Sequence, residues 1–186
     1  MNWAAAAAAA TLSIAAPCPS DAELPLNKPQ LLLKSVESRD TGFSIEAWSD
    51  STDGTYLIGE AVGLFVRGSA DAYYTVLAIG PRGEVQRLHP AAGERSELLQ
   101  AGEVLALPPD GTGPIIRVVH PVGTELIKIV GSKSPLALPP EFGEGPVPAD
   151  FAAAILQTEL LRLSDEAVSV VDIELRTLTE RVCKDR

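Results

Sequence analysis

The sequence predicts a mainly β protein, a β-sandwich or barrel with one added C-terminal α-helix and a closing edge strand. Between residues 43 and 131, short runs of alternating, β-branched and aromatic residues recur, and turns that contain glycine and proline separate them. After residue 150, one segment repeats its apolar residues with the period of a helix, and the next segment alternates. The first observation predicts the sheets, and the second predicts the elements that complete the domain.

The totals fit a single acidic domain. The chain has 186 residues, enough for one core, and its 15 Gly and 15 Pro favour many turns over long helices. The formal net charge of −10 argues against binding to nucleic acid or to an anionic membrane surface, because both need Lys and Arg. Membrane contact is therefore expected only through the N-terminal segment.

Residues 1–22 have the character of a signal-like leader. Met1–Ala16 is uncharged and apolar, and it is shorter than a membrane span. Small residues favour cleavage after Ala22, so we expect a periplasmic or secreted protein. Two alternatives are an outer-membrane lipoprotein acylated at Cys18 and a cytoplasmic protein with an alanine-rich tail. Cys18 and Cys183 are the only cysteines, which makes them candidates for a disulfide bridge.

Residues 23–42 are predicted to form a linker, because they are polar and mixed and contain Pro25 and Pro29. Their short apolar patch, Leu31–Leu33, is expected to pair at a sheet edge. Phe43–Trp48 alternates and predicts the first strand of a sandwich core that spans residues 43–131.

The stretch from Gly54 to Gly83 is the most informative part of the core. Val62–Arg67 alternates as a half-buried strand does, and Ala72–Ile79 is dense in aromatic and β-branched residues. The proline and glycine of residues 80–83 suit a tight turn, which predicts a hairpin with Val85 and Leu88 on the returning strand.

The remainder of the core is predicted from shorter patterns. Pro90–Gly102 reads as a polar loop with a helical turn at residues 96–100. Three further strands are expected at Glu103–Leu107, Ile115–Val119 and Glu125–Val130. Residues 132–149 are rich in proline and glycine and predict an extended connector over the surface.

Residues 150–186 are predicted to complete the same domain. Asp150 is the expected N-cap of a helix over Phe151–Leu163, whose apolar stripe packs on the sandwich while Glu159 faces water. Ala167–Leu178 alternates and should add a strand to a sheet edge. Its more apolar set is expected to face the core and comprises Ser169, Val171, Ile173, Leu175 and Thr177.

Four aromatic residues are the candidates for an interaction surface: Trp48, Tyr56, Tyr73 and Tyr74. Adjacent residues of a strand point to opposite faces, so at most one of Tyr73 and Tyr74 joins the core. Core packing accounts for most residues of this kind. Those that stay exposed form the expected surface for a peptide or a sugar.

Other patterns are weak as functional sites. His89 and His120 could serve a small hydrolase, but no nucleophile motif accompanies them. Asp50, Asp53 and Glu60 carry oxygen ligands of the kind that calcium uses, but their spacing is not that of an EF-hand and fits an ordinary turn. The glycine-rich turns lack the lysine of a phosphate-binding loop. We therefore expect no catalytic residue, no metal, no nucleotide and no other cofactor.

A set of short motifs resembles a bacterial family of domains of unknown function. The motifs are Thr55–Glu60, Val62–Arg67, Asp71–Tyr73, Val76–Gly83, Leu88–Pro90, Ala101–Glu103 and Pro121–Lys128. Such domains are often found C-terminal to caspase-like peptidases, protein kinases or exported multidomain proteins. The resemblance covers about residues 43–130 and implies an immunoglobulin-like antiparallel β-sandwich with an accessory role.

These features together predict a non-catalytic protein-interaction or accessory module of an exported bacterial envelope protein. A protein partner in the envelope is expected, with contact through sheet edges and loops. One alternative is a structural subunit of an envelope or extracellular assembly. A second alternative is a small hydrolase that uses His120 or His89.

Overall fold

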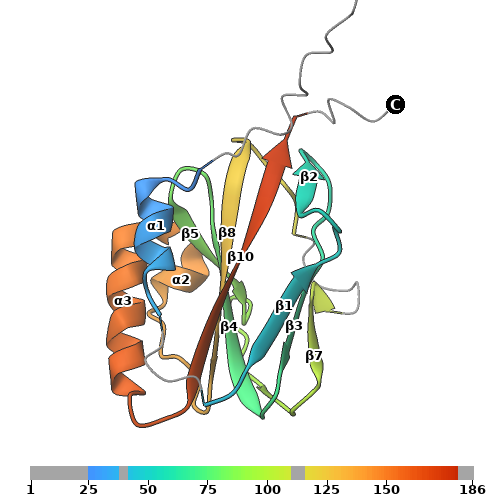
Figure 1. The fold of residues 1–186 in the computed structure, drawn as a ribbon. Coiled ribbons are helices and arrows are strands. Elements are labelled where there is room, and N and C mark those ends of the chain that lie inside the picture. Colours follow the sequence, from blue (N-terminus) through green and yellow to red (C-terminus); the bar gives the residue numbers. More distant parts are fainter. Residues whose placement is uncertain (1–24, 38–41, 110–115, 180–186) are drawn as a thin grey trace, which may run out of the picture.

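The computed structural model describes residues 25–37, 42–109 and 116–179, and it has three layers (Figure 1). Helices α1 (Lys28–Lys34) and α3 (Ala149–Arg162) cover one face of a large central sheet, and a three-stranded sheet covers the other face. The prediction of a mainly β sandwich with a C-terminal helix and a closing strand is confirmed. The leader at 1–22, Cys18 and Cys183 lie outside the described residues.

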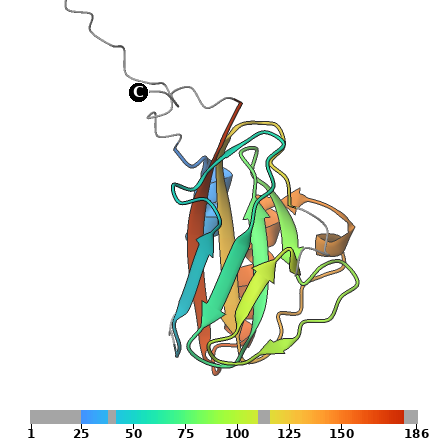
Figure 2. The ribbon, with the colours of Figure 1, turned by 90° about the vertical axis from the view of Figure 1, so that its right-hand side faces the viewer.

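The small sheet consists of β1 (Ile45–Ser49), β3 (Leu64–Gly68) and β7 (Val104–Leu107), all antiparallel, with β3 in the middle. Figure 2 looks onto this sheet, which lies in front of the larger one. The strand β7 lies within a segment predicted as a strand, and β1 and β3 each extend one residue beyond theirs. Their alternation divides the side chains into an inner set and an outer set.

The large sheet is built around β8 (Gly123–Ser132), which pairs antiparallel with β4 and with β10. The predicted hairpin is present, because β4 (Ala72–Ile79) turns into β5 (Glu84–His89). The closing strand β10 (Val168–Leu178) pairs with β8 along its length, and its last three residues also pair in parallel with β2 (Thr55–Leu57). Two short strands complete the sheet, β6 (Leu98–Leu99) beside β4 and β9 (Val147–Pro148) beside β5.

Each face of the large sheet has its own apolar core. On β8, Leu126 and Val130 pack with the helices, while Ile127 and Ile129 pack with the small sheet. On β10, alternate residues likewise face opposite sides. Val171, Ile173 and Leu175 were predicted to face the core, and they pack in the core between the two sheets. Because both faces are covered, the central strands are apolar on both sides.

The predicted linker at 23–42 is wrong for the residues that form α1. Asn27 accepts a hydrogen bond from the Gln30 backbone N–H at 2.9 Å, and the Gln30 side chain accepts one from the Asn27 N–H at 2.9 Å, which forms a capping box. Leu31–Leu33 therefore belongs to a helix and not to a sheet edge. Leu33 and Val36 are buried against the large sheet.

Helix α1 is fastened to the end of the β4–β5 hairpin by buried polar groups. The side-chain amide of Gln30 is 1% exposed and donates to the carbonyls of Ile79, Gly80 and Thr124 at 3.3, 3.2 and 2.6 Å. The Asn27 amide donates to Pro81 O at 2.6 Å. These contacts give the buried amide of Gln30 hydrogen-bond partners at the end of the sheet, as a buried polar group requires.

A buried cation ties α1 to the middle of the sheet. Lys128 on β8 is 0% exposed, and its Nζ donates to the carbonyl of Val36 at 3.0 Å. The same Nζ lies 2.9 and 3.1 Å from the two carboxylate oxygens of Asp172 on β10. A buried charge needs such a partner, so three distant parts of the chain meet at one ammonium group.

Helix α3 packs on the sheet as predicted, with Ala152 and Leu156 fully buried. Two details of the prediction are wrong. The helix begins at Ala149, so Asp150 lies in its first turn and is not the N-cap. Glu159 is buried rather than exposed, because it pairs with Arg162 at 2.7 Å and accepts a hydrogen bond from the Ala137 N–H at 2.7 Å.

Three surface segments also differ from expectation. Pro90–Gly102 contains β6 instead of a helical turn. Of the strand expected at Ile115–Val119, residues 116–119 form only one isolated bridge, between Arg117 and Ala61. The connector at 132–149 includes the short helix α2 (Glu141–Glu144) and β9, because Phe142 and Val147 turn inward into the core.

Candidate interaction surface

The outer face of the small sheet collects side chains that alternation turns away from the core. On β3, Leu64 and Val66 are buried, which leaves Phe65 and Arg67 pointing outward. The antiparallel register sets Trp48 opposite Phe65 and Glu46 opposite Arg67. On the other side of β3, Ala106 lies opposite Phe65 and Val104 opposite Arg67. We call these six residues the outer-sheet surface.

The centre of the outer-sheet surface is an ordered aromatic cluster. The rings of Trp48 and Phe65 stack with centroids 5.6 Å apart and an interplanar angle of 17°. The guanidinium of Arg67 lies 5.9 Å from the centroid of the Trp48 ring and forms an ion pair with Glu46. The contacts with Phe65 and Arg67 thus position the Trp48 indole in the unbound protein.

This cluster is exposed and close to neutral. Trp48 and Val104 are 40% and 43% exposed, and the Glu46 and Arg67 charges compensate each other. Aromatic and arginine side chains are enriched at the centres of protein interfaces, where Lys, Glu and Asp are depleted. The surface is therefore suited to non-covalent contact with a protein, in which its aromatic side chains would be removed from water.

The four predicted aromatic residues do not share a surface. Only Trp48 lies on the outer-sheet surface. Tyr56 is 4% exposed, and its hydroxyl donates to Asp50 at 2.5 Å, so burial and this hydrogen bond raise the pKa of Tyr56. Tyr74 is 2% exposed within the core, and burial raises the pKa of its phenol. Tyr73 lies half-buried on the opposite face of β4, in agreement with the expected split of the adjacent pair.

Sequence reasoning missed Phe65 and Arg67. The signal was present, since both alternate with the apolar residues Leu64 and Val66. A residue that alternates with a buried set must lie on the other face of its strand. What the pattern does not contain is the strand order, which sets Trp48 beside Phe65.

The two histidines lie on separate segments. His89 ends β5 and is half-buried; burial lowers the pKa of its imidazole, while Glu94 and Glu97 act in the opposite direction. His120 is exposed in a bend before β8. In the part of the chain that the structure describes, neither imidazole is hydrogen-bonded to a serine.

The acidic residues of the β1–β2 turn stabilise the turn itself. Asp50 accepts hydrogen bonds from Tyr56 and from the Gly63 N–H at 2.5 and 3.0 Å. Asp53 accepts from the Thr55 N–H and the Ser51 hydroxyl, both at 2.9 Å, and these bonds lower its pKa. Over the described ranges, no three His, Cys, Asp or Glu side chains gather as they would around a metal ion.

The fold and this surface define the class of the protein: a β-sandwich domain that carries an exposed aromatic cluster on its outer sheet. Residues 55–135 match the model of a family described as Domain of unknown function (DUF4384), which confirms the resemblance drawn from the sequence motifs. No curated protein matches the chain. Among the described helices, none is both long and apolar enough to cross a membrane.

Proposed function

We propose that this chain is a non-catalytic protein-interaction module that binds its partner through the outer-sheet surface. The observation that carries the proposal is the exposed stack of Trp48 on Phe65, with Arg67 beside it. At many protein interfaces a few residues supply most of the binding energy, and tryptophan and arginine are enriched among them. The partner is a protein that covers this surface and adds polar contacts at its rim.

The proposal includes a place of action, the envelope of a bacterium. Its support is the apolar character of Met1–Ala16 and the small residues before Glu23. The test is the mass of the mature chain purified from a cell fractionation. A chain that begins at Glu23 in the periplasmic or secreted fraction supports export, whereas an uncleaved chain in the cytoplasm contradicts it.

The binding surface is tested by site-specific photo-crosslinking in the native host. A photoreactive amino acid replaces Val104, which lies on the outer-sheet surface, or Leu98, which is 51% exposed on β6 outside this surface. We expect a defined protein adduct from position 104 only. Trp48→Ala in the same chain should remove the adduct, because truncating such an anchor weakens binding by about tenfold or more.

Controls separate loss of binding from loss of folding. Trp48→Ala must keep the wild-type circular dichroism and melting temperature, as expected for a side chain that is partly exposed. The crosslinked partner is then purified, and its Kd for wild type and Trp48→Ala is measured by calorimetry. Equal Kd values, or equal adducts from positions 98 and 104, would refute the role of this surface.

A further inference from the structure

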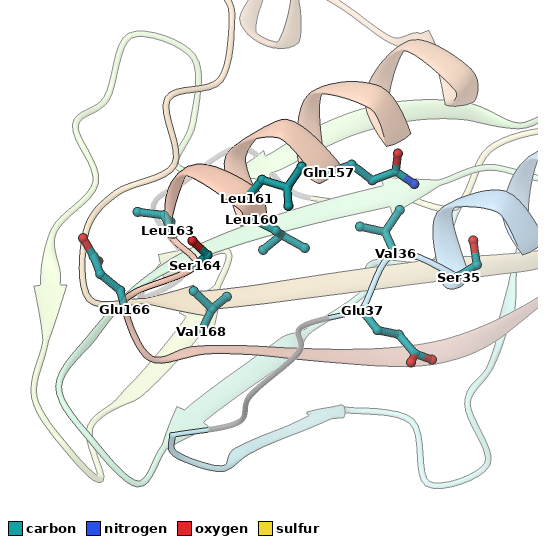
Figure 3. A pocket seen from close by; sticks show the side chains of 10 residues that line it. All are labelled: Ser35, Val36, Glu37, Gln157, Leu160, Leu161, Leu163, Ser164, Glu166 and Val168. Carbon is teal, nitrogen blue, oxygen red and sulfur yellow. The ribbon is translucent and has the colours of Figure 1, made fainter.

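A groove lies on the helical side of the molecule, where the C-terminal ends of α1 and α3 meet over the beginning of β10 (Figure 3). The end of α1 contributes Val36, α3 contributes Leu160 and Leu161, and β10 contributes Val168. The volume is about 380 Å³, near the lower end of the range of roughly 300 to 1,000 Å³ for ligand pockets. This size suits a few inserted side chains better than a large cofactor.

The centre of the groove is apolar. Val36 and Val168 are 3% and 4% exposed and belong to the core, so the floor is fixed by the packing of the domain. Leu161 projects at the rim and is 59% exposed, the largest exposure given for any leucine among the described residues. An aliphatic side chain placed here would cover Leu161 and gain apolar contact on several sides.

The charge around the groove is negative. Among the described lining residues, the charged side chains are Glu37 and Glu166, and Figure 3 shows them on opposite margins of the apolar centre. The cations of the last helical turns, Lys34 and Arg162, pair with the carboxylates of Glu174 and Glu159 at 2.6 and 2.7 Å, and the Arg162 charge also acts on Glu166 without pairing with it. The C-terminal end of α3 adds the negative pole of its helix dipole.

Glu166 adds an independent observation that favours a cation. Its Oε1 accepts a hydrogen bond from the Ser134 hydroxyl at 2.9 Å. Its Oε2 is buried and has no hydrogen-bond partner within the described ranges. A buried carboxylate oxygen without a donor is costly, and a positive charge brought to this margin would lower that cost.

We infer that this groove, which we call the helix-end groove, binds a segment of another protein in which aliphatic side chains are flanked by Lys or Arg. The aliphatic groups fill the centre between Leu160, Leu161 and Val36, and the basic residues approach Glu37 and Glu166. Charge complementarity supports this partner, because the lining offers apolar surface and acids together. The site lies on the opposite side of the molecule from the outer-sheet surface and is separate from the proposed function (Figure 1).

The test uses fluorescence anisotropy with three labelled octapeptides and the full chain. The probe has two central leucines flanked by lysines; one control peptide replaces leucine by alanine, and the other replaces lysine by glutamate. Saturable binding is expected only for the lysine–leucine probe. Leu161→Ser and Glu37→Gln should each raise its Kd by about tenfold, which corresponds to the loss of one well-placed contact.

Matched variants away from the groove control for general effects of charge and apolarity. Leu98→Ser removes a leucine that is 51% exposed on β6, and Glu141→Gln removes an exposed acid on α2. Both should keep the wild-type Kd. Equal weakening by all four variants, equal binding of the alanine peptide, or no saturation at millimolar protein contradicts the proposal. Sedimentation of the chain alone as a dimer that Leu161→Ser dissociates also overturns it, since the occupant is then a second copy.

Discussion

Gly83 lies in the β4–β5 turn, next to Pro29 of α1. Its φ of +85° suits glycine, and a Cβ at this position would lie 2.4 Å from the Cβ of Pro29. Gly93 has a similar φ of +81° but no atom within 4 Å of its Cβ position. The two glycines therefore differ in crowding while sharing a left-handed backbone.

We predict that Gly93→Ala lowers the free energy of unfolding by about 1–2 kcal/mol, which is the cost of the left-handed backbone alone. Gly83→Ala should cost about 1–3 kcal/mol more, because α1 must shift away from the added methyl group. Urea unfolding at neutral pH measures both. Equal losses for the two variants would show that the contact with Pro29 does not matter.

Glu159 gives the fold a defined response to acid. Burial acts to raise its pKa, but hydrogen bonds from Arg162 and from the Ala137 N–H, together with the Arg162 charge, bring it below the ordinary 4.5. The folded state thus binds this proton less tightly than the unfolded state does. The resulting stabilisation is complete above pH 4.5 and is lost as the pH falls through the lowered pKa.

Glu159→Gln should therefore be less stable than wild type at pH 6, and the difference should shrink as the pH falls to 3. Urea unfolding of both proteins at several pH values provides the measurement. The subtraction cancels the other carboxylates, which the two proteins share. A difference that stays constant with pH would mean that the Glu159 charge does not contribute.

Single residues also show how far the sequence alone could predict the surface. Trp48 was a candidate and is exposed, but Tyr56 and Tyr74 are equally aromatic and are buried. Residue type cannot separate these cases. The pairing of β1 with β3 decides which aromatic residues meet, and strand order is a long-range property that alternation does not contain.

At the scale of elements, the longer strands were predictable, whereas α1 and the short strands β2, β6 and β9 were not. Ala72–Ile79 matches its strand residue for residue, because a long β-branched run between turn residues permits few other structures. The prolines at 25 and 29 suggested a linker, yet proline is well suited to the first turn of a helix. The spacing of Asn27 and Gln30 was the available signal, since it forms the capping box.

Two neighbouring residues of α1, one buried and one exposed, allow a test of what holds this helix on the sheet. Gln30→Ala removes the donor to three carbonyls and should lower the free energy of unfolding by about 2–3 kcal/mol. Leu31→Ala changes the neighbouring residue, which is 52% exposed, and should have an effect within about 0.5 kcal/mol. Thermal and urea unfolding measure both. If Gln30→Ala is as mild as Leu31→Ala, the buried amide is not what holds the helix.

At the scale of the whole molecule, the folding unit is larger than the family match. Residues 55–135 omit β10, which pairs with β8 at ten positions, and also omit β1, α1 and α3. Both apolar cores take residues from these outer segments. Without them, β8 loses a neighbouring strand and one face of the sheet loses its cover.

We expect a fragment of residues 55–135 to lack cooperative unfolding, and a fragment of residues 26–179 to melt like the full chain. Differential scanning calorimetry and the dispersion of amide proton signals distinguish the two outcomes. The physical reason is that the fragment lacks β10 beside β8 and lacks both helices that cover one face of the sheet, so the apolar residues of that face would be exposed to water. A sharp melting transition for the shorter fragment would place the boundary of the folding unit at the family match.

Lys128 has a further consequence for solution chemistry. Its amine is enclosed beneath the end of α1, so a reagent that acylates lysines can reach it only in molecules where that helix has moved away. The exposed Lys28 at the start of α1 should react in the native state and serve as an internal reference. The ratio of the two labelling rates, followed by mass spectrometry, therefore reports how often the segment at the end of α1 separates from β8 in the native protein.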